Sequence, residues 1–117
     1  MALPEFDQAL EEGDLDRMVE SARQATDFLK ALSHEGRLLI LCHLCTGEKS
    51  VTELERLLSS RQAAVSQQLA RLRLEGLVDH RREGKMIYYR LNDPRVRRMI
   101  ETIYELFCEK PSDRNPD

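Results

Sequence analysis

Apolar residues in the first third of the chain alternate spacings of three and four, which is the spacing of an amphipathic α-helix. After Asp14, which can act as an N-cap, this series predicts a helix over residues 14–32 with apolar positions at Leu15, Met18, Ala22, Ala25, Leu29 and Leu32. Such a seam is typical of a helix that packs lengthwise against a partner helix. We therefore interpret this segment as a candidate dimerisation helix.

A second helix is predicted to begin after Ser33, a candidate N-cap, and to end at Gly47, which can supply a left-handed stop. One apolar stripe consists of Leu38, Leu41, Cys42 and Cys45, and Leu39, Ile40 and Leu44 widen it almost all round. A helix that is apolar on nearly every side belongs in the middle of a core. We therefore expect this helix to be the central one.

The next two predicted helices are short and close together. Residues 50–53 read Ser-Val-Thr-Glu, a capping box that opens a helix through Leu58, because the Ser and Glu side chains can satisfy two free amides. From Gln62 to Glu75 the apolar positions are Val65, Leu69 and Leu72, and Gly76 follows them. Two short helices joined by a few polar residues predict a helix-turn-helix over residues 50–76.

The period of the pattern then changes from that of a helix to that of a strand. Two runs rich in Val, Ile and Tyr, residues 77–82 and 86–91, flank Glu-Gly-Lys and predict a β-hairpin, or wing, over residues 77–91. Asp93 and Pro94 can start a last helix over residues 93–109, another candidate dimerisation helix, with one apolar face made of Val96, Met99, Ile100, Ile103 and Phe107.

The predicted fold is mostly α with a small β-hairpin (α+β), a winged helix-turn-helix with the element order ααααββα. At 117 residues the chain can build one modest core, so we expect a single domain over residues 1–117 with frayed ends. No apolar run is long enough for a membrane span and the start has no basic, apolar export signal, which predicts a cytoplasmic protein with no membrane partner. Its three cysteines do not predict a disulfide framework, because the reducing cytoplasm keeps thiols free.

The charges are segregated along the chain, although the net charge is only −3. Residues 1–60 carry 6 Lys and Arg against 12 Asp and Glu, whereas residues 61–98 carry 10 against 4. A basic segment of this kind can attract phosphates despite an acidic remainder, although charge blocks are also common on ordinary solvated faces. The basic segment coincides with the second half of the helix-turn-helix and the wing, and this coincidence favours duplex DNA as the partner.

In a helix-turn-helix the second helix enters the major groove, so its polar face should reach base edges and phosphates. A cationic wing would contact the neighbouring groove or strand, and His80 also lies in this hairpin. A symmetric homodimer closed by the first and last helices would read a pseudo-palindromic operator. The candidate DNA-binding residues are Arg61, Gln62, Ala63, Ser66, Gln67, Arg71, Arg81, Arg82 and Lys85.

Several segments together resemble the ArsR family of winged-helix repressors. They are residues 28–41, residues 66–78, the Arg-Arg-Glu-Gly-Lys run at 81–85 and Tyr-Tyr-Arg-Leu at 88–91, and the similarity covers roughly residues 15–108. The resemblance implies a dimer formed by the first and last helices, and repression that is relieved by a metal ion or a chemical signal. Ala63 and Gln68 stand where the family commonly has Ser and His, which leaves the operator sequence open.

Both metal sites that the family commonly uses lack their ligands here, because residues 51–54 contain no Cys and residues 93–109 contain no His. Cys42 and Cys108 instead match the paired positions of the persulfide-sensing, SqrR/BigR-like branch. The resemblance implies that these two thiols react with reactive sulfur species as the inducer, become joined by a polysulfide and release DNA. We interpret Cys45, the end of a C-x-x-C, as core packing, with a bystander thiol as the alternative.

Other functions remain as alternatives to the persulfide-responsive repressor. Within the family they are a metal-responsive or a general redox-responsive repressor that uses the three cysteines differently. From another class they are a thiol redox enzyme or a protein-interaction module. We expect the protein not to be an enzyme and to bind neither a metal nor a cofactor. The sequence has neither a Ser, His and acid arrangement for hydrolysis nor a glycine-rich phosphate loop.

Overall fold

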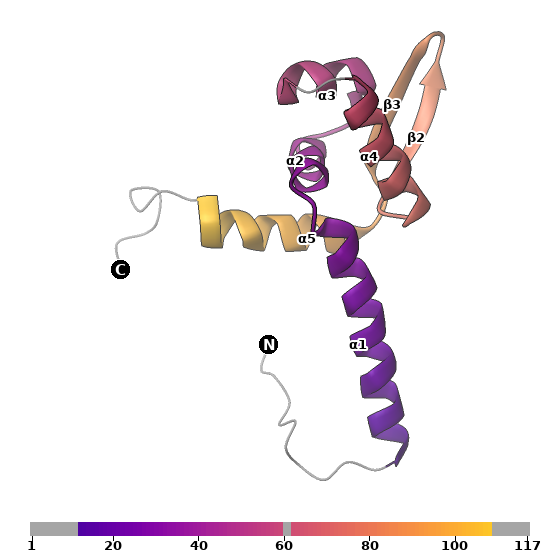
Figure 1. The fold of residues 1–117 in the computed structure, drawn as a ribbon, viewed down its shortest axis with the longest axis vertical. Helices are drawn as coiled ribbons and strands as arrows, with labels where there is room; N and C mark the ends of the chain where they lie inside the picture. Colours follow the sequence, from indigo (N-terminus) through magenta and orange to yellow (C-terminus); the bar gives the residue numbers. More distant parts are fainter. Residues whose placement is uncertain (1–11, 60–61, 109–117) are drawn as a thin grey trace. The chain divides into compact units, whose positions relative to one another are not determined.

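The computed structural model describes residues 12–59 and 62–108. The chain falls into two compact units, divided between Lys30 and Ala31, which are described separately. The prediction of a single domain stays a prediction. The elements are α1 (Glu12–Leu32), α2 (Glu35–Leu44), β1 (Lys49–Ser50), α3 (Val51–Leu58), α4 (Gln62–Leu74), β2 (Val78–Glu83), β3 (Met86–Leu91), α5 (Pro94–Ile103) and the π-helical turn η1 (Tyr104–Cys108). Figure 1 labels the α-helices and the strands β2 and β3.

The long helix α1 matches the helix that the alternating pattern predicts over residues 14–32. Its apolar residues Leu15, Val19 and Leu29 are exposed. Only the last two residues, Ala31 and Leu32, are buried, and both belong to the second unit. Of the predicted seam, Leu15, Ala22, Ala25 and Leu29 are therefore solvent-exposed in the isolated chain, Met18 is half-buried and Leu32 is buried.

The core of the second unit is formed by one face of each helix from α2 to α5, together with the base of the hairpin. In α4 the buried residues are Val65, Leu69 and Leu72, as the i, i+4, i+7 spacing predicts. The other buried apolar residues are Ile40, Leu41, Leu44, Leu54, Leu77, Val78, Tyr89, Val96 and Ile100. α4 contacts α2, α3 and β2, so the core holds the two short helices against the hairpin.

α2 contacts α3, α4, α5 and β3, as expected for a central helix, but it is not buried on every side. Its buried residues are Ile40, Leu41 and Leu44, whereas Cys42 is exposed and Leu39 is 45% exposed. The apolar band is wider than the surface that neighbouring elements cover. One side of α2 is therefore accessible to small molecules.

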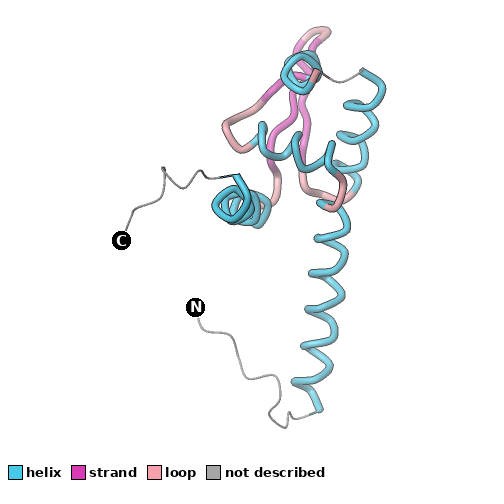
Figure 2. Tube along the Cα trace, turned by 60° about the vertical axis from the view of Figure 1, so that its left-hand side comes forward, coloured by secondary structure: helices cyan, strands magenta, loops and turns pink. Residues whose placement is uncertain are grey.

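The hairpin predicted at residues 77–91 is present as β2 and β3, which pair antiparallel with Arg81 opposite Tyr88 and Glu83 opposite Met86. Figure 2 shows the two strands in magenta, extending beyond the helices. A third strand, β1, pairs with the other edge of β3, giving the order β1-β3-β2. The sequence pattern missed β1 because two residues are too few to show an alternation.

The helix caps agree with the sequence at two of four predicted positions; the prediction of Asp14 as an N-cap is wrong, because α1 already begins at Glu12. Ser50 and Glu53 form the predicted capping box, with 3.1 Å in each direction between backbone nitrogen and side-chain oxygen. Asp93 caps α5. For α2 the cap is His34 and not Ser33, because the extended backbone of His34 lets its Nδ1 accept the Gly36 N–H at 3.1 Å.

The end of the last helix departs from the predicted α-helical pattern. α5 changes at Tyr104 into a π-helical turn that runs to Cys108, and a π-turn has one more residue between bonded groups than an α-turn. Val96 and Ile100 are buried as predicted, but Phe107 is 80% exposed and does not continue their face. The extra residue rotates the side chains after Ile103 away from the α-helical register.

Among the described helices, none has both the length and the apolar character needed to cross a bilayer.

Candidate functional site

The first candidate surface lies on α4, opposite its buried face. Ser66, Gln67 and Arg71 are exposed there, as the sequence predicts for residues that reach DNA. Arg71 pairs with Glu75 at 3.3 Å along the same helix. Gln62 and Ala63 begin α4, but their side chains lie outside the described part, as does the whole of Arg61.

The wing carries the other predicted cations, and its strand β2 contacts α4. Arg82 and Lys85 are exposed, and Arg82 Nε donates to the Gly84 carbonyl at 3.2 Å. His80 does not lie at the tip of the hairpin, since it pairs with Tyr89 within the strands. Its ring stacks on the Tyr89 ring at a centroid distance of 5.6 Å. Arg71 of α4 and the hairpin residues Arg82 and Lys85 thus lie on two elements that contact each other.

Arg81 differs from its neighbour Arg82 in having acidic partners. Its guanidinium donates to both carboxylate oxygens of Glu48, at 2.7 to 3.1 Å, and to Glu83 Oε2 at 2.9 Å. It also lies 4.6 Å above the Tyr88 ring centroid. The Arg81 hydrogen bond lowers the pKa of Glu48, so both partners stay charged at neutral pH and much of the Arg81 charge is compensated.

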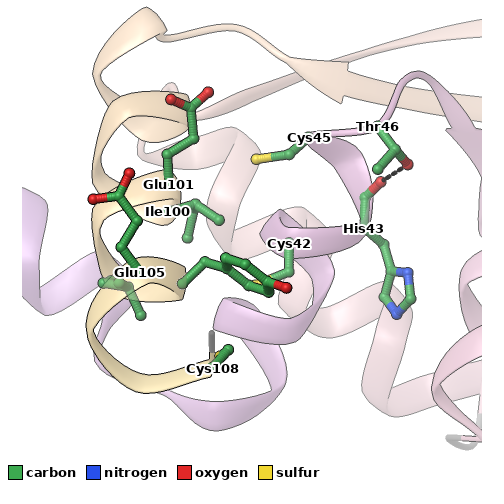
Figure 3. Close-up of a pocket in the computed structure, with 10 residues that line it drawn as sticks. Cys42, His43, Cys45, Thr46, Ile100, Glu101, Glu105 and Cys108 are labelled. Carbon is green, nitrogen blue, oxygen red and sulfur yellow. Dashed lines mark hydrogen bonds between the residues drawn. The ribbon is translucent and has the colours of Figure 1, made fainter. Parts of the chain in front are cut away.

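The second candidate site is a pocket of about 620 Å³ between α2 and the α5–η1 segment. Figure 3 shows the α2 residues Cys42 and Cys45 on one side, and Ile100, Glu101 and Glu105 on the other. The lining residues are Cys42, His43, Cys45, Thr46, Ile100, Glu101, Ile103, Tyr104, Glu105 and Cys108. The two predicted sensing thiols, 66 positions apart in the sequence, thus line one pocket.

All three cysteines of the chain line this pocket, and all three are free thiols. Cys42 and Cys108 are exposed, and Cys45 is half-buried. The interpretation of Cys45 as core packing is therefore wrong, because the end of α2 turns this side chain toward the pocket and not toward the core. Figure 3 shows its sulfur pointing toward the helix that carries Glu101.

The surroundings raise the pKa of both α2 thiols. For Cys42 the main cause is partial burial, and charge on the nearby Cys45 and Cys108 adds to it. For Cys45 the main cause is again burial; the Arg97 guanidinium lowers the pKa and the Glu101 carboxylate raises it. Since the thiolate is the nucleophile, the pocket limits the reactivity of both α2 thiols at neutral pH.

Arg97 connects the two walls of the pocket. It comes from α5, and its Nη1 donates to the backbone carbonyl of Cys45 at 2.5 Å. This bond satisfies a carbonyl at the end of α2, where helices leave such acceptors without an internal partner. Arg97 therefore fixes the turn that carries Cys45 to the helix that leads to Cys108.

Sequence reasoning missed Cys45, Arg97, Glu101 and Glu105 as residues of this site. The spacing of the last three contained a signal, because steps of four from 97 to 101 and 105 keep side chains on one helix face. Counting back from Cys108 along that face would have found the two glutamates. Nothing in the sequence shows that this face meets the open side of α2.

No group of three or more His, Cys, Asp and Glu side chains is arranged to hold a metal ion within residues 12–59 and 62–108.

The two charges beside Cys45 give a test with opposite signs. Glu101→Gln is expected to lower the pKa of Cys45, and Arg97→Met is expected to raise it, because each change removes one of the charges that act on this thiol. At neutral pH the thiolate fraction therefore rises in the first variant and falls in the second, each by about two- to tenfold. The measurement is the rate of iodoacetamide alkylation in protein whose other two cysteines are Ser.

Glu105→Gln is the matched control, since it removes a carboxylate from the same pocket that is not among the charges acting on Cys45. Equal alkylation rates in the Glu101 and Arg97 variants would contradict the electrostatic account.

Known proteins are similar to this chain in both sequence and fold. The family described as "Bacterial regulatory protein, arsR family" matches residues 34–80. The "Biofilm growth-associated repressor" of Agrobacterium fabrum is 47% identical over 94 residues, which are 80% of each chain. The "Transcriptional activator HlyU" of Vibrio cholerae is 42% identical over 96 residues, which are 82% of this chain and 89% of that protein.

Solved structures agree with these relatives. Reduced HlyU from Vibrio cholerae has a TM-score of 0.76 at 42% identity, over 80% of this chain and 98% of that one. A homodimeric winged helix-turn-helix DNA-binding domain from Mycobacterium bovis, described as a possible ArsR-family regulator, has a TM-score of 0.67 at 29% identity, over 87% and 89% of the two chains. The predicted fold class is thereby confirmed, and the chain belongs to the bacterial ArsR family, a family of winged-helix transcriptional regulators and not of enzymes.

Proposed function

We propose that this protein is a homodimeric transcriptional repressor that leaves its operator when Cys42 and Cys108 are joined by a sulfur bridge. The observation that carries the proposal is the pocket in which these two thiols, one on α2 and one at the end of η1, line the same space. The DNA-reading surface is the exposed face of α4 with the wing.

The polar residues of this surface divide into two kinds of DNA contact. Gln67 can read a base edge, and Ser66 can contact either a base or a phosphate. Arg71, Arg82 and Lys85 supply the charge that attracts phosphates, and Arg61, Gln62, Ala63 and Arg81 complete the proposed set. Because Arg81 is already held by Glu48 and Glu83, we assign it mainly to shaping the wing.

The exposed apolar residues of α1 support assembly into a dimer. Leu15, Val19 and Leu29 would cost free energy in water unless another surface covered them. In η1, Leu106 and Phe107 are similarly exposed. The related domain from Mycobacterium bovis is homodimeric. A two-fold dimer would present α4 twice and so require an operator with two similar half-sites.

The proposed inducer is a low-molecular-weight persulfide, RS–SH, whose outer sulfur a thiolate can attack. The Cys42 thiolate takes this sulfur and RS⁻ leaves; the resulting hydropersulfide takes a second sulfur in the same way. The Cys108 thiolate then attacks the first added sulfur and displaces the second as HS⁻. Two thiols and two RS–SH thus give one Cys42–S–S–S–Cys108 bridge, two RSH and one H₂S.

A bridge of this length suits two thiols on different elements. A direct disulfide needs Cβ atoms about 3.5–4.5 Å apart, whereas an added sulfur tolerates a wider separation. The bridge would tie α2 to η1 across the pocket. Because α2 also packs against α4, a change in its position would be passed to the DNA-reading helix.

The test is DNA release by two variants that each lack one of the sensing thiols, Cys42→Ser and Cys108→Ser. A duplex selected by the reduced protein from a randomised library is titrated with and without glutathione persulfide, and fluorescence anisotropy reports binding. The unmodified protein is expected to lose at least about tenfold in affinity on treatment, corresponding to roughly 1.4 kcal/mol of coupling, and both variants are expected to keep theirs.

Thr46→Ser is the matched control, because it changes a hydroxyl-bearing residue of the same pocket and removes no thiol. Release of DNA from the Cys42→Ser and Cys108→Ser variants to the same extent as from the unmodified protein would eliminate the sensing mechanism. It would leave the DNA-binding function standing.

Activation of transcription is the alternative to repression, and one relative favours it: the Vibrio cholerae protein described as a transcriptional activator. An activator and a repressor of this fold can share the same DNA surface, since the outcome depends on where the operator lies relative to the promoter. A reporter gene placed behind the selected operator separates the two, because repression predicts higher expression after persulfide treatment and activation predicts lower expression.

A further inference from the structure

Cys45 is the one thiol of the pocket that the proposed function does not use. It lines the same space as Cys42 and Cys108, and its half-buried sulfur points toward α5 in Figure 3. We propose that Cys45 is a competing resolving thiol, which attacks a persulfide on Cys42 and closes a bond within α2 in place of the bridge to Cys108. This inference rests on the proposed persulfide chemistry of Cys42.

The backbone at the end of α2 places the two thiols on one side. The Cys45 N–H lies 3.1 Å from the Leu41 carbonyl and 3.3 Å from the Cys42 carbonyl, so it is shared between an α-type and a 3₁₀-type bond. The next two amides, of Thr46 and Gly47, bond to the third residue before them. In a 3₁₀ turn, side chains three residues apart eclipse each other. Residues three apart share a helix face in either geometry, so Cys45 lies on the same face as Cys42, and its charge acts on the Cys42 thiol.

One neighbour of Cys45, the Arg97 guanidinium, favours its role as an attacking group. Arg97 is the cation that acts on this thiol, and it also holds the Cys45 carbonyl. A thiolate at Cys45 is thus paired with a positive charge, whereas the neighbours that act on Cys42 are the other two thiols. Burial and the Glu101 carboxylate act against Arg97, so the pKa of Cys45 is raised on balance and its thiolate fraction at neutral pH is low.

The step is balanced without a further oxidant. The Cys45 thiolate attacks Sγ of the Cys42 persulfide, the bond from Sγ to the outer sulfur breaks, and HS⁻ leaves with the electron pair and takes up a proton. The products are a Cys42–Cys45 disulfide and H₂S, so two thiols are oxidised and the sulfane sulfur is reduced. Both ends of the new bond lie in one helical turn, and α2 stays unlinked from η1.

The consequence is a threshold for the response to persulfide. Each Cys42 persulfide that Cys45 captures is spent as H₂S, and two RSH must reduce the internal disulfide, giving RSSR, before Cys42 can react again; that part of the persulfide dose forms no bridge. Removing Cys45 should therefore shift DNA release to a lower persulfide dose, by roughly twofold if the two thiols compete equally.

The experiment combines peptide mapping with DNA release in three proteins: unmodified, Cys45→Ser and Cys108→Ser. Trypsin yields one peptide over residues 38–49 with both α2 cysteines and another over residues 99–114 with Cys108. After glutathione persulfide treatment of the Cys108→Ser variant, the first peptide is expected to be lighter by two hydrogens while DNA stays bound. In the Cys45→Ser variant, the two peptides should be joined and release should occur at the lower dose. Thr46→Ser serves as the control for packing at the turn.

An open persulfide on Cys42 that persists in the Cys108→Ser variant, with no internal disulfide, would overturn the proposal, as would equal persulfide doses for release in the Cys45→Ser and unmodified proteins. The proposed function fails separately: if the unmodified and Cys45→Ser proteins never join the two peptides, the bridging mechanism is wrong even where the internal disulfide forms. Joined peptides without any internal disulfide would support the proposed function and eliminate the competing thiol.

Discussion

Replacing Leu69 with Ala is expected to lower the free energy of unfolding by about 2–5 kcal/mol. Leu69 is fully buried on α4, where that helix contacts α2 and α3, so the lost side chain leaves a cavity that three elements share. Domains of this size are stable by only about 5–15 kcal/mol, so the loss is a large fraction of the total. Urea unfolding at a fixed protein concentration measures it.

The matched control is Leu74→Ala on the same helix. Leu74 is 80% exposed, and a substitution there should change the free energy of unfolding by less than about 0.5 kcal/mol. The two variants remove the same atoms from the same helix and differ only in burial. Equal effects would mean that α4 does not pack by its Val65, Leu69 and Leu72 face.

Replacing Gln67 with Ala is expected to weaken operator binding by about 1–3 kcal/mol for each half-site, since a bidentate contact to a base edge has that value. A dimer loses the contact twice, about 2–6 kcal/mol in total, so the affinity should fall by roughly 30-fold to 10⁴-fold. Gln67 is uncharged, and its loss should leave the affinity for random DNA and the dependence on salt unchanged. Anisotropy titrations on operator and random duplexes at several salt concentrations measure all three quantities.

Gln24→Ala is the control, because Gln24 is an exposed helical glutamine on α1, outside the proposed DNA surface. Arg82→Ala supplies the contrast: it should weaken binding to both duplexes and reduce the salt dependence. If Gln67→Ala weakened random and operator DNA equally, Gln67 would not be a base-reading residue.

The order of the main elements could be predicted from the sequence because helices and the hairpin bury one face each, and each leaves its own period in the apolar positions. Val65, Leu69 and Leu72 show this for α4. Short or irregular elements leave no such period. This is why the two-residue strand β1 and the π-helical turn η1 were missed, and why Phe107 was assigned to the wrong face.

The candidate site divides in the same way. The exposed positions Ser66, Gln67 and Arg71 follow from the buried face of α4, since a helix has only one other side to offer. The position of Cys45 could not be predicted. A cysteine among apolar residues of a helix has the same local sequence whether its side chain faces the core or a pocket. The Glu48 partner of Arg81 was equally hidden, as the two are 33 positions apart.

Local patterns were enough to predict the helix-turn-helix, the wing and the family resemblance, because periodicity, capping residues and turn residues act over a few positions. The open side of α2, the approach of α5 and η1 to it, and the pocket that three thiols share with two glutamates are visible in the three-dimensional structure alone, as is the bond from Arg97 to the Cys45 carbonyl. The physical reason is that solvent exposure and charge at a thiol are set by residues distant in the chain, which no local pattern records.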